Sequence, residues 1–163
     1  MISVFGNDAI KTTLVNKVYT RIVHKWKQFE GLEFERHSWV DVPVPFNLEV
    51  FSRRLLLSLC SEDHISEEIA AIGVMRDPCL TEECCKFLHE VDCLVVINGL
   101  QSTHDWDSIK AAFLSEPTKG CILVITNEAS VATHCAQEEG AVLNMEDMNA
   151  DGMLRQWLKV CVV

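Results

Sequence analysis

Positive charge is scarce in this chain of 163 residues, which has 14 Lys and Arg residues, 24 Asp and Glu residues and a formal net charge of −10. Such a chain repels the phosphate backbone of nucleic acids unless a local basic patch compensates. The densest basic clusters, Lys25–Lys27 and Arg53–Arg54, are too small for that purpose. Long apolar runs are lacking too, since none reaches the roughly 18 residues that a membrane-spanning helix needs. We therefore expect neither a nucleic-acid partner nor a membrane span.

The chain also lacks the Cys-x-x-Cys spacing of common zinc motifs, although it contains eight cysteines. Most of them lie in apolar runs, as Cys93 does before Leu94–Ile97, where a free thiol packs like a small hydrophobic side chain. The start of the chain does not resemble a secretory signal peptide, because Asp8 and Lys11 interrupt the only early apolar stretch. We therefore predict a cytoplasmic, reducing environment and eight free thiols: Cys60, Cys79, Cys84, Cys85, Cys93, Cys121, Cys135 and Cys161.

A zinc site is the first alternative for these cysteines. Its candidate ligands are Cys84–Cys85, His89, Cys93 and His134–Cys135. Two adjacent residues of a helix point about 100° apart, so Cys84 and Cys85 do not converge on one ion. Burial as small hydrophobic side chains explains them better, and we expect no metal site.

Two further polar clusters also have simple interpretations. A nucleophilic pair within His134–Cys135, or between Cys135 and His104, has no supporting motif, so we predict no catalytic residue. The run His104–Asp107 is better explained by a polar loop in which Asp105 caps a helix that begins near Trp106. The acidic residues of 61–68 are most simply a solvated face, although a basic partner could bind there.

Short apolar runs alternate with longer segments of helical periodicity, a pattern typical of a parallel α/β sheet. Strands are predicted at residues 2–6, 37–42, 94–97, 121–126 and 141–145. Helices are predicted from about Lys11, from Leu48 after an Asn47 cap, over residues 65–72, after a Thr81 cap, and over residues 106–113, 130–138 and 150–160. We therefore predict one α/β domain, a three-layer sandwich around a mainly parallel five-stranded sheet with right-handed crossovers.

The N-terminal unit has the chemistry of a phosphate-binding loop. The strand Ile2–Gly6 ends in glycine, and Lys11, Thr12 and Thr13 follow near the predicted start of a helix. In such loops backbone N–H groups surround the phosphates, the lysine neutralises them and a hydroxyl binds Mg²⁺. Gly6, Lys11, Thr12 and Thr13 are therefore the candidate nucleotide-binding residues.

Five blocks, taken in order, resemble the nucleotide-binding (NB) subdomain of the NB-ARC module in plant NLR disease-resistance proteins. They are residues 2–19, with the phosphate-loop unit; 34–42, with Trp39–Val40; 94–109, similar to a Walker B strand and its continuation; 120–132, similar to a motif that normally ends in Thr-Thr-Arg; and 143–158, similar to the start of the ARC region. The resemblance implies a P-loop NTPase-like fold with strand order 5-1-4-3-2. It also implies a single NB subdomain over residues 1–163, in which the ARC-like region starts at about residue 146.

The positions that handle nucleotide chemistry in that family differ here. Ile10 precedes the lysine where the family has glycine, and Asp8 adds a carboxylate to the predicted anion cradle. Asn98–Gly99 follow the Walker B strand in place of aspartates, so no carboxylate is available there for Mg²⁺ or water. Asn127 stands in the place of the arginine that would sense the γ-phosphate.

These differences predict a degenerate NB subdomain in an immune receptor. We expect it to act in defence signalling as a regulatory or protein-interaction module, with little or no ATP hydrolysis and no required cofactor. Its expected partners are other NLR domains or immune-signalling proteins. The alternative is a functional ADP/ATP-binding switch, with weak binding of ADP or ATP and Mg²⁺ through Lys11–Thr13. A kinase acting on nucleoside phosphates is the third and weakest hypothesis.

Overall fold

The computed structural model describes residues 2–6, 8–25, 34–60, 71–76, 78–136, 141–144 and 149–161. Its strands are β1 (Ile2–Phe5), β2 (Arg36–Asp41), β3 (Cys93–Leu100), β4 (Gly120–Thr126) and β5 (Ala141–Asn144). Its helices are α1 (Asp8–Lys25), α2 (Leu48–Cys60), α4 (Cys79–Glu90), α5 (Thr103–Phe113), α6 (Ala129–Cys135) and α7 (Ala150–Cys161). Residues 71–74 are helical as well.

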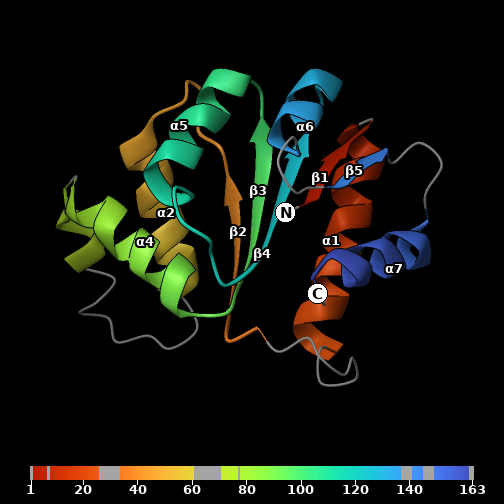
Figure 1. Ribbon diagram of the computed structural model, residues 1–163, viewed down its shortest axis with the longest axis horizontal. Helices are drawn as coiled ribbons and strands as arrows, with labels where there is room; N and C mark the ends of the chain where they lie inside the picture. The colour runs from red at the N-terminus through yellow and green to blue at the C-terminus, as the bar shows by residue number, and fades with distance from the viewer. Residues whose placement is uncertain are drawn as a thin grey trace.

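The five strands form one sheet in which every neighbouring pair is parallel. Their order is β2-β3-β4-β1-β5, and Figure 1 shows them side by side. Read from the other edge this is 5-1-4-3-2, so the predicted fold class and strand order are confirmed. Because all strands run the same way, their carboxyl ends meet at one edge of the sheet.

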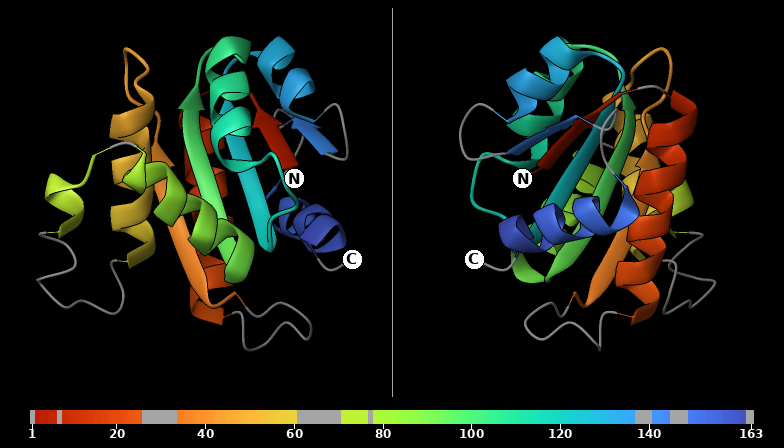
Figure 2. Two further views of the ribbon diagram at one scale, coloured as in Figure 1. Left: turned by 60° about the vertical axis from the view of Figure 1, so that its left-hand side comes forward. Right: turned by 90° about the vertical axis from the view of Figure 1, so that its right-hand side faces the viewer.

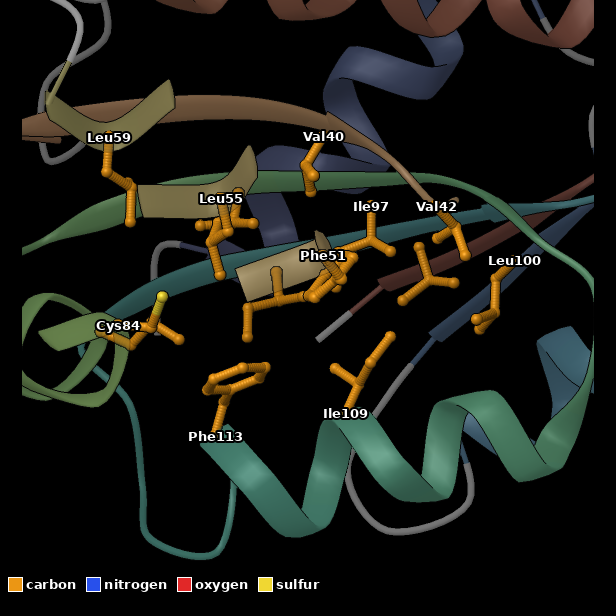
Figure 3. Close-up of a cluster of buried hydrophobic side chains, with 14 of the residues drawn as sticks. Val40, Val42, Phe51, Leu55, Leu59, Cys84, Ile97, Leu100, Ile109 and Phe113 are labelled. Atoms are coloured by element: carbon orange, nitrogen blue, oxygen red, sulfur yellow. The ribbon is translucent and has the colours of Figure 1, made fainter. Parts of the chain in front are cut away.

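Helices cover both faces of the sheet (Figures 1 and 2), as the three-layer prediction requires. One face packs against α1 and α7, with Val15, Val18 and Met153 buried against alternate strand residues such as Leu94 and Val96. The other face packs against α2, α4, α5 and α6. Figure 3 shows side chains of α2, α4 and α5 converging on it, among them Phe51, Leu55, Cys84, Ile109 and Phe113.

The internal strand β3 explains why the sheet needs both helical layers. Its residues Cys93–Ile97 are all buried, and successive side chains point to opposite faces. Leu94 and Val96 belong to the α1 side, whereas Val95 and Ile97 belong to the α2 side. A strand buried on both faces has a continuous apolar sequence, which is the pattern that predicted it.

Three predicted helix starts were wrong. α1 begins at Asp8 and not near Lys11, and α4 begins at Cys79, so Thr81 lies inside it. α5 begins at Thr103 and is capped by Ser102, whose hydroxyl accepts a hydrogen bond from the Asp105 N–H at 3.1 Å. Asp105 is therefore not the cap. The Asn47 cap was correct, since its side chain accepts the Val50 N–H at 2.9 Å. The predicted helix over residues 65–72 lies mostly outside the described residues.

Candidate functional site

The candidate site lies at the carboxyl edge of the sheet, where open α/β sheets bind their ligands. Phe5, the last residue of β1, is in register with Thr126 of β4 and Asn144 of β5. On the other side of β4, Asn98 of β3 is in register with Asp41 of β2. The Gly6 end of the predicted phosphate loop is therefore adjacent to β4, and the Walker B position lies one strand further along.

The connection between β1 and α1 is short. β1 ends at Phe5 and α1 begins at Asp8, which leaves Gly6 and residue 7, the latter outside the described residues. Gly6 has a φ of 152°, a value that other residues rarely adopt, and this agrees with a glycine at the end of the strand. The backbone that a phosphate-binding loop would use to surround an anion is helical here from Asp8 onward.

This helix start changes the position of the predicted phosphate-binding residues. Lys11 is the fourth residue of α1, about 4.5 Å along the helix axis from Asp8, and Thr12 and Thr13 follow in the second turn. The side chains of Lys11 and Thr12 are outside the described part of the structure. Gly6, Lys11, Thr12 and Thr13 are consecutive along one β–α unit, but only Gly6 stands at the end of the strand.

Thr13 lies on an open groove between α1 and α7. The groove has a volume of about 630 Å³, and its lining residues are Thr13, Asn16, Lys17, Thr20, Arg21 and Ala150. Arg21 of α1 forms an ion pair with Asp151 of α7 at 2.6 Å across the same pair of helices. The side chains of the groove are mostly exposed, so it is a polar surface depression between the two helices.

At the Walker B position the side chain of Asn98 is engaged with the neighbouring strand. Its amide nitrogen donates a hydrogen bond to the Asp41 carboxylate at 2.7 Å. Gly99 follows with a φ of +81°, at an irregularity of the β3–β4 pairing between Asn98 and Leu100. Glycine suits this position because other residues are strained at a positive φ. Both residues that replace the expected aspartates therefore have structural roles.

Thr126, at the end of β4, also has a structural role. Its side chain is fully buried, and its hydroxyl donates a hydrogen bond to the Leu100 carbonyl oxygen at 2.6 Å. The hydroxyl oxygen of Thr126 in turn accepts a hydrogen bond from the Glu128 N–H at 3.1 Å. Asn127, predicted to replace the phosphate-sensing arginine, is exposed between Thr126 and the start of α6.

Among the cysteines whose side chains the structure describes, all but one are free thiols as predicted, and Cys161 lies outside that set. The free thiols are Cys60, Cys79, Cys84, Cys85, Cys93 and Cys135, and only Cys79 among them is exposed. Cys121 is disulfide-bonded, so the prediction of a free thiol is wrong for this residue. The described residues contain no group of three or more His, Cys, Asp or Glu residues that could hold a metal ion.

Burial makes several of the thiols unreactive. It raises the pKa of Cys93 to about 12, with a further contribution from the Asp92 carboxylate. It also raises the pKa of Cys135 to about 12, assisted by Asp107. Burial and, to a lesser extent, Glu116 raise the pKa of Cys85. Such thiols stay protonated at neutral pH, which does not suit a nucleophile.

The polar run His104–Asp107 splits into separate contacts. Asp107 of α5 is 2.7 Å from Nε2 of His134 in α6, and this pair links the two helices. His104 is 3.9 Å from Asp105, and its side chain is 90% exposed. The run lies inside α5 and is not the predicted polar loop, and its residues make separate contacts that do not converge on one point.

Sequence reasoning missed two residues of this edge, Asp41 and Thr126. Thr126 ends a predicted strand and Asp41 is the next-to-last residue of another, and the strand order implied by the resemblance places β2 beside β3 and β4 beside both β3 and β1. Aligning the strand ends would have placed Asp41 and Thr126 near the end of β3. That signal was present in the sequence, but the hydrogen bonds themselves depend on the register.

Comparison with known proteins agrees with this architecture. The sequence profile of the NB-ARC domain matches residues 1–155. The chain is 29% identical over 118 residues to the disease resistance protein At1g50180 of Arabidopsis thaliana, and 28% identical over 117 residues to the Arabidopsis disease resistance protein RXW24L. Each alignment covers 72% of this chain but only 13% and 12% of those relatives. Because the profile matches residues 1–155 of the 163 residues, the chain belongs to the NB-ARC domain family.

Proposed function

We propose that this chain is the nucleotide-binding part of a plant NLR-type immune receptor in the cytoplasm. In this proposal it acts in defence signalling as a regulatory or protein-interaction module with little or no ATP hydrolysis. The NB-ARC profile and the two disease-resistance relatives support the receptor class. The described residues contain no helix that combines the length and the apolar composition needed to cross a bilayer. The partners would be other domains of the receptor or signalling proteins.

The observation that carries the proposal is the hydrogen bond between Asn98 and Asp41. NB-ARC domains are P-loop NTPase-like and bind nucleotide with Mg²⁺. At the end of β3 this chain has an amide that already donates to Asp41, where ion binding needs a carboxylate. Gly99 supplies no side chain, and the Thr126 hydroxyl already bonds to Leu100 and Glu128. These residues do not fit a hydrated Mg²⁺ ion, so we derive no hydrolytic step.

The short β1–α1 connection supports the same conclusion. A phosphate-binding loop surrounds the β-phosphate with successive free N–H groups before its helix begins. Here α1 already begins at Asp8, so only the first-turn N–H groups of the helix face the end of β1. They can attract one anionic group, but they cannot enclose a polyphosphate.

The alternative is an ADP- or ATP-binding switch, and α1 is the feature that favours it. Its N-terminus carries partial positive charge, and Lys11 and Thr12 lie within its first five residues. This hypothesis predicts nucleotide that co-purifies with the protein and is lost in Lys11→Ala.

Isothermal titration with ADP and with ATP, each with and without Mg²⁺, tests both hypotheses. The matched variant is Lys11→Ala, and a typical NB-ARC domain with intact phosphate loop serves as positive control. We expect no saturable heat up to about millimolar nucleotide and no phosphate release. Micromolar Mg²⁺-dependent ATP binding together with phosphate release would contradict the proposal. Tight ADP binding that Lys11→Ala abolishes would establish the switch.

A further inference from the structure

We propose that Asp41 determines which side chain residue 98 can carry. Its carboxylate accepts a hydrogen bond from the side chain at the end of β3, so an aspartate metal ligand restored at position 98 destabilises the fold while Asp41 is present. Asp41 is a positioning residue in this proposal. The inference rests on the proposed function, because it explains why the chain keeps an amide where Mg²⁺ and nucleotide binding would need a carboxylate. The absence of a metal ligand at position 98 then depends on two residues, Asp41 and Asn98, on neighbouring strands.

The register brings these two side chains together. Asp41 and Asn98 are directly paired in the parallel β2–β3 ladder, whose strands lie about 4.8 Å apart. Paired residues of neighbouring strands have side chains on the same face of the sheet. The Asn98 amide nitrogen lies 2.7 Å from a carboxylate oxygen of Asp41, a short, charge-assisted hydrogen bond.

The backbone around Asp41 keeps the pair from separating. The Val42 N–H donates to the Asn98 carbonyl at 2.9 Å, which continues the ladder one residue past Asp41. The Arg54 guanidinium donates to the Asp41 carbonyl at 3.0 Å. Arg54 is thus held at the backbone of Asp41, and within the described chain Asn98 provides the only hydrogen bond to the Asp41 carboxylate.

An aspartate at position 98 would change this contact from attraction to repulsion. Two carboxylates would then lie within hydrogen-bond distance, and like charges at that separation cannot both stay ionised without cost. Asp41 is exposed, so solvent reduces the repulsion but does not remove it. Exchanging the two residues would restore one amide and one carboxylate, with the hydrogen bond running in the opposite direction.

A double-mutant cycle in thermal denaturation tests the inference. The proteins are the parent chain, Asn98→Asp, Asp41→Asn and the double variant, measured at pH 7.5 with EDTA so that no divalent cation bridges the carboxylates. We expect Asn98→Asp to lower Tm by about 3–6 °C, and the double variant to return to within about 1–2 °C of the parent. Asp41→Asn alone leaves two amides that can still bond, so its Tm should change by less than about 2 °C.

Two outcomes of the double-mutant cycle would contradict the inference. Equal stability of Asn98→Asp and the parent would overturn the inference, and so would a double variant no more stable than Asn98→Asp. Asn98→Ala separates repulsion from simple loss of a hydrogen bond, because it removes the donor without adding charge. We expect it to be more stable than Asn98→Asp, and equal stability would count against repulsion.

The cycle uses no nucleotide, so its result is independent of the titrations that test the proposed function. If the chain binds ATP tightly but the double variant regains the parent's stability, the Asp41–Asn98 coupling holds and the proposed function fails. If the chain binds no nucleotide and the two substitutions have additive effects, the proposed function holds and the coupling fails.

Discussion

The hydroxyl of Thr126 donates a hydrogen bond to the carbonyl oxygen of Leu100 across 2.6 Å, at a position with no solvent exposure. The bond joins the ends of β3 and β4 just past the irregularity at Gly99, where the regular ladder between the two strands is interrupted. The Thr126 hydroxyl oxygen also accepts a hydrogen bond from the Glu128 N–H, so one side chain fixes both the end of β4 and the start of α6. Thr126, which lies in a motif of the family, thus stabilises the fold at this edge of the sheet.

Thr126→Val should destabilise the fold. Valine has nearly the shape of threonine, but it leaves the Leu100 carbonyl and the Glu128 N–H without this partner, at a cost of about 1–3 kcal/mol in the free energy of unfolding. Urea denaturation measures the loss. Thr126→Ser keeps the hydroxyl and should lose less. If valine is tolerated without cost, the hydrogen bonds do not stabilise this edge.

Arg53 should hold the backbone of residues 71–76 in its folded conformation. Its guanidinium donates to the carbonyls of Ile72, Gly73 and Met75, the last at 2.7 Å, and it pairs with Glu49 at 2.9 Å. Arg53→Lys keeps the charge but cannot make this set of bonds. We expect it to speed hydrogen exchange of amides in 71–76 by about tenfold.

Arg54→Ala is the matched control for that experiment, because Arg54 is the adjacent arginine and its guanidinium donates a hydrogen bond to a different segment, at the Asp41 carbonyl. It should leave exchange in residues 71–76 unchanged. Equal acceleration by both variants would show that the effect comes from general destabilisation of α2.

Gly120→Ala should be severely destabilising, whereas Gly99→Ala should be tolerated. Both glycines have positive φ values, +85° and +81°. A Cβ on Gly120 would lie 2.1 Å from the Cys93 carbonyl oxygen, while a Cβ on Gly99 would meet nothing within 4 Å. We expect a loss of more than about 3 kcal/mol for Gly120→Ala and about 1–2 kcal/mol for Gly99→Ala. Chemical denaturation compares them, and similar losses would contradict the predicted clash.

The free thiols should differ sharply in reactivity. Cys79 is exposed, whereas burial raises the pKa values of Cys93 and Cys135 to about 12. Iodoacetamide at pH 8 should therefore label Cys79 first and leave Cys93 and Cys135 unlabelled until urea unfolds the chain. Mass spectrometry of tryptic peptides identifies the order. Early labelling of Cys93 would contradict its burial.

The same thiols should make stability depend on pH at alkaline values. Because their pKa in the folded chain lies above the ordinary 9, the unfolded chain loses these protons first. Their contribution to stability is therefore complete below about pH 9 and is lost as pH rises toward 12. The urea midpoint should fall between pH 8 and pH 10, and a Cys93→Ala/Cys135→Ala variant should show a smaller fall. An unchanged slope in that variant would assign the effect to other groups.

The helix starts show which parts of the local structure the sequence could predict. Asn47 was identified correctly as a cap, because one capping residue precedes its helix. Ser102 and Asp105 are both of residue types that can cap a helix, and Ser102 is the cap because its hydroxyl accepts the Asp105 N–H. α1 extends back to Asp8 because no glycine follows Gly6 to interrupt it, and an acidic residue is favourable in a first turn.

The sequence alone determined the five apolar strands, the helices between them and the absence of a carboxylate at Asn98–Gly99, because these follow from local pattern and residue type. The resemblance supplied the strand order, which the parallel sheet confirms. Only the tertiary structure decided what Asn98 does. Its partner Asp41 is 57 residues away, and the two meet because β2 and β3 pair in one register. A shift by one residue would have turned the side chains to opposite faces of the sheet.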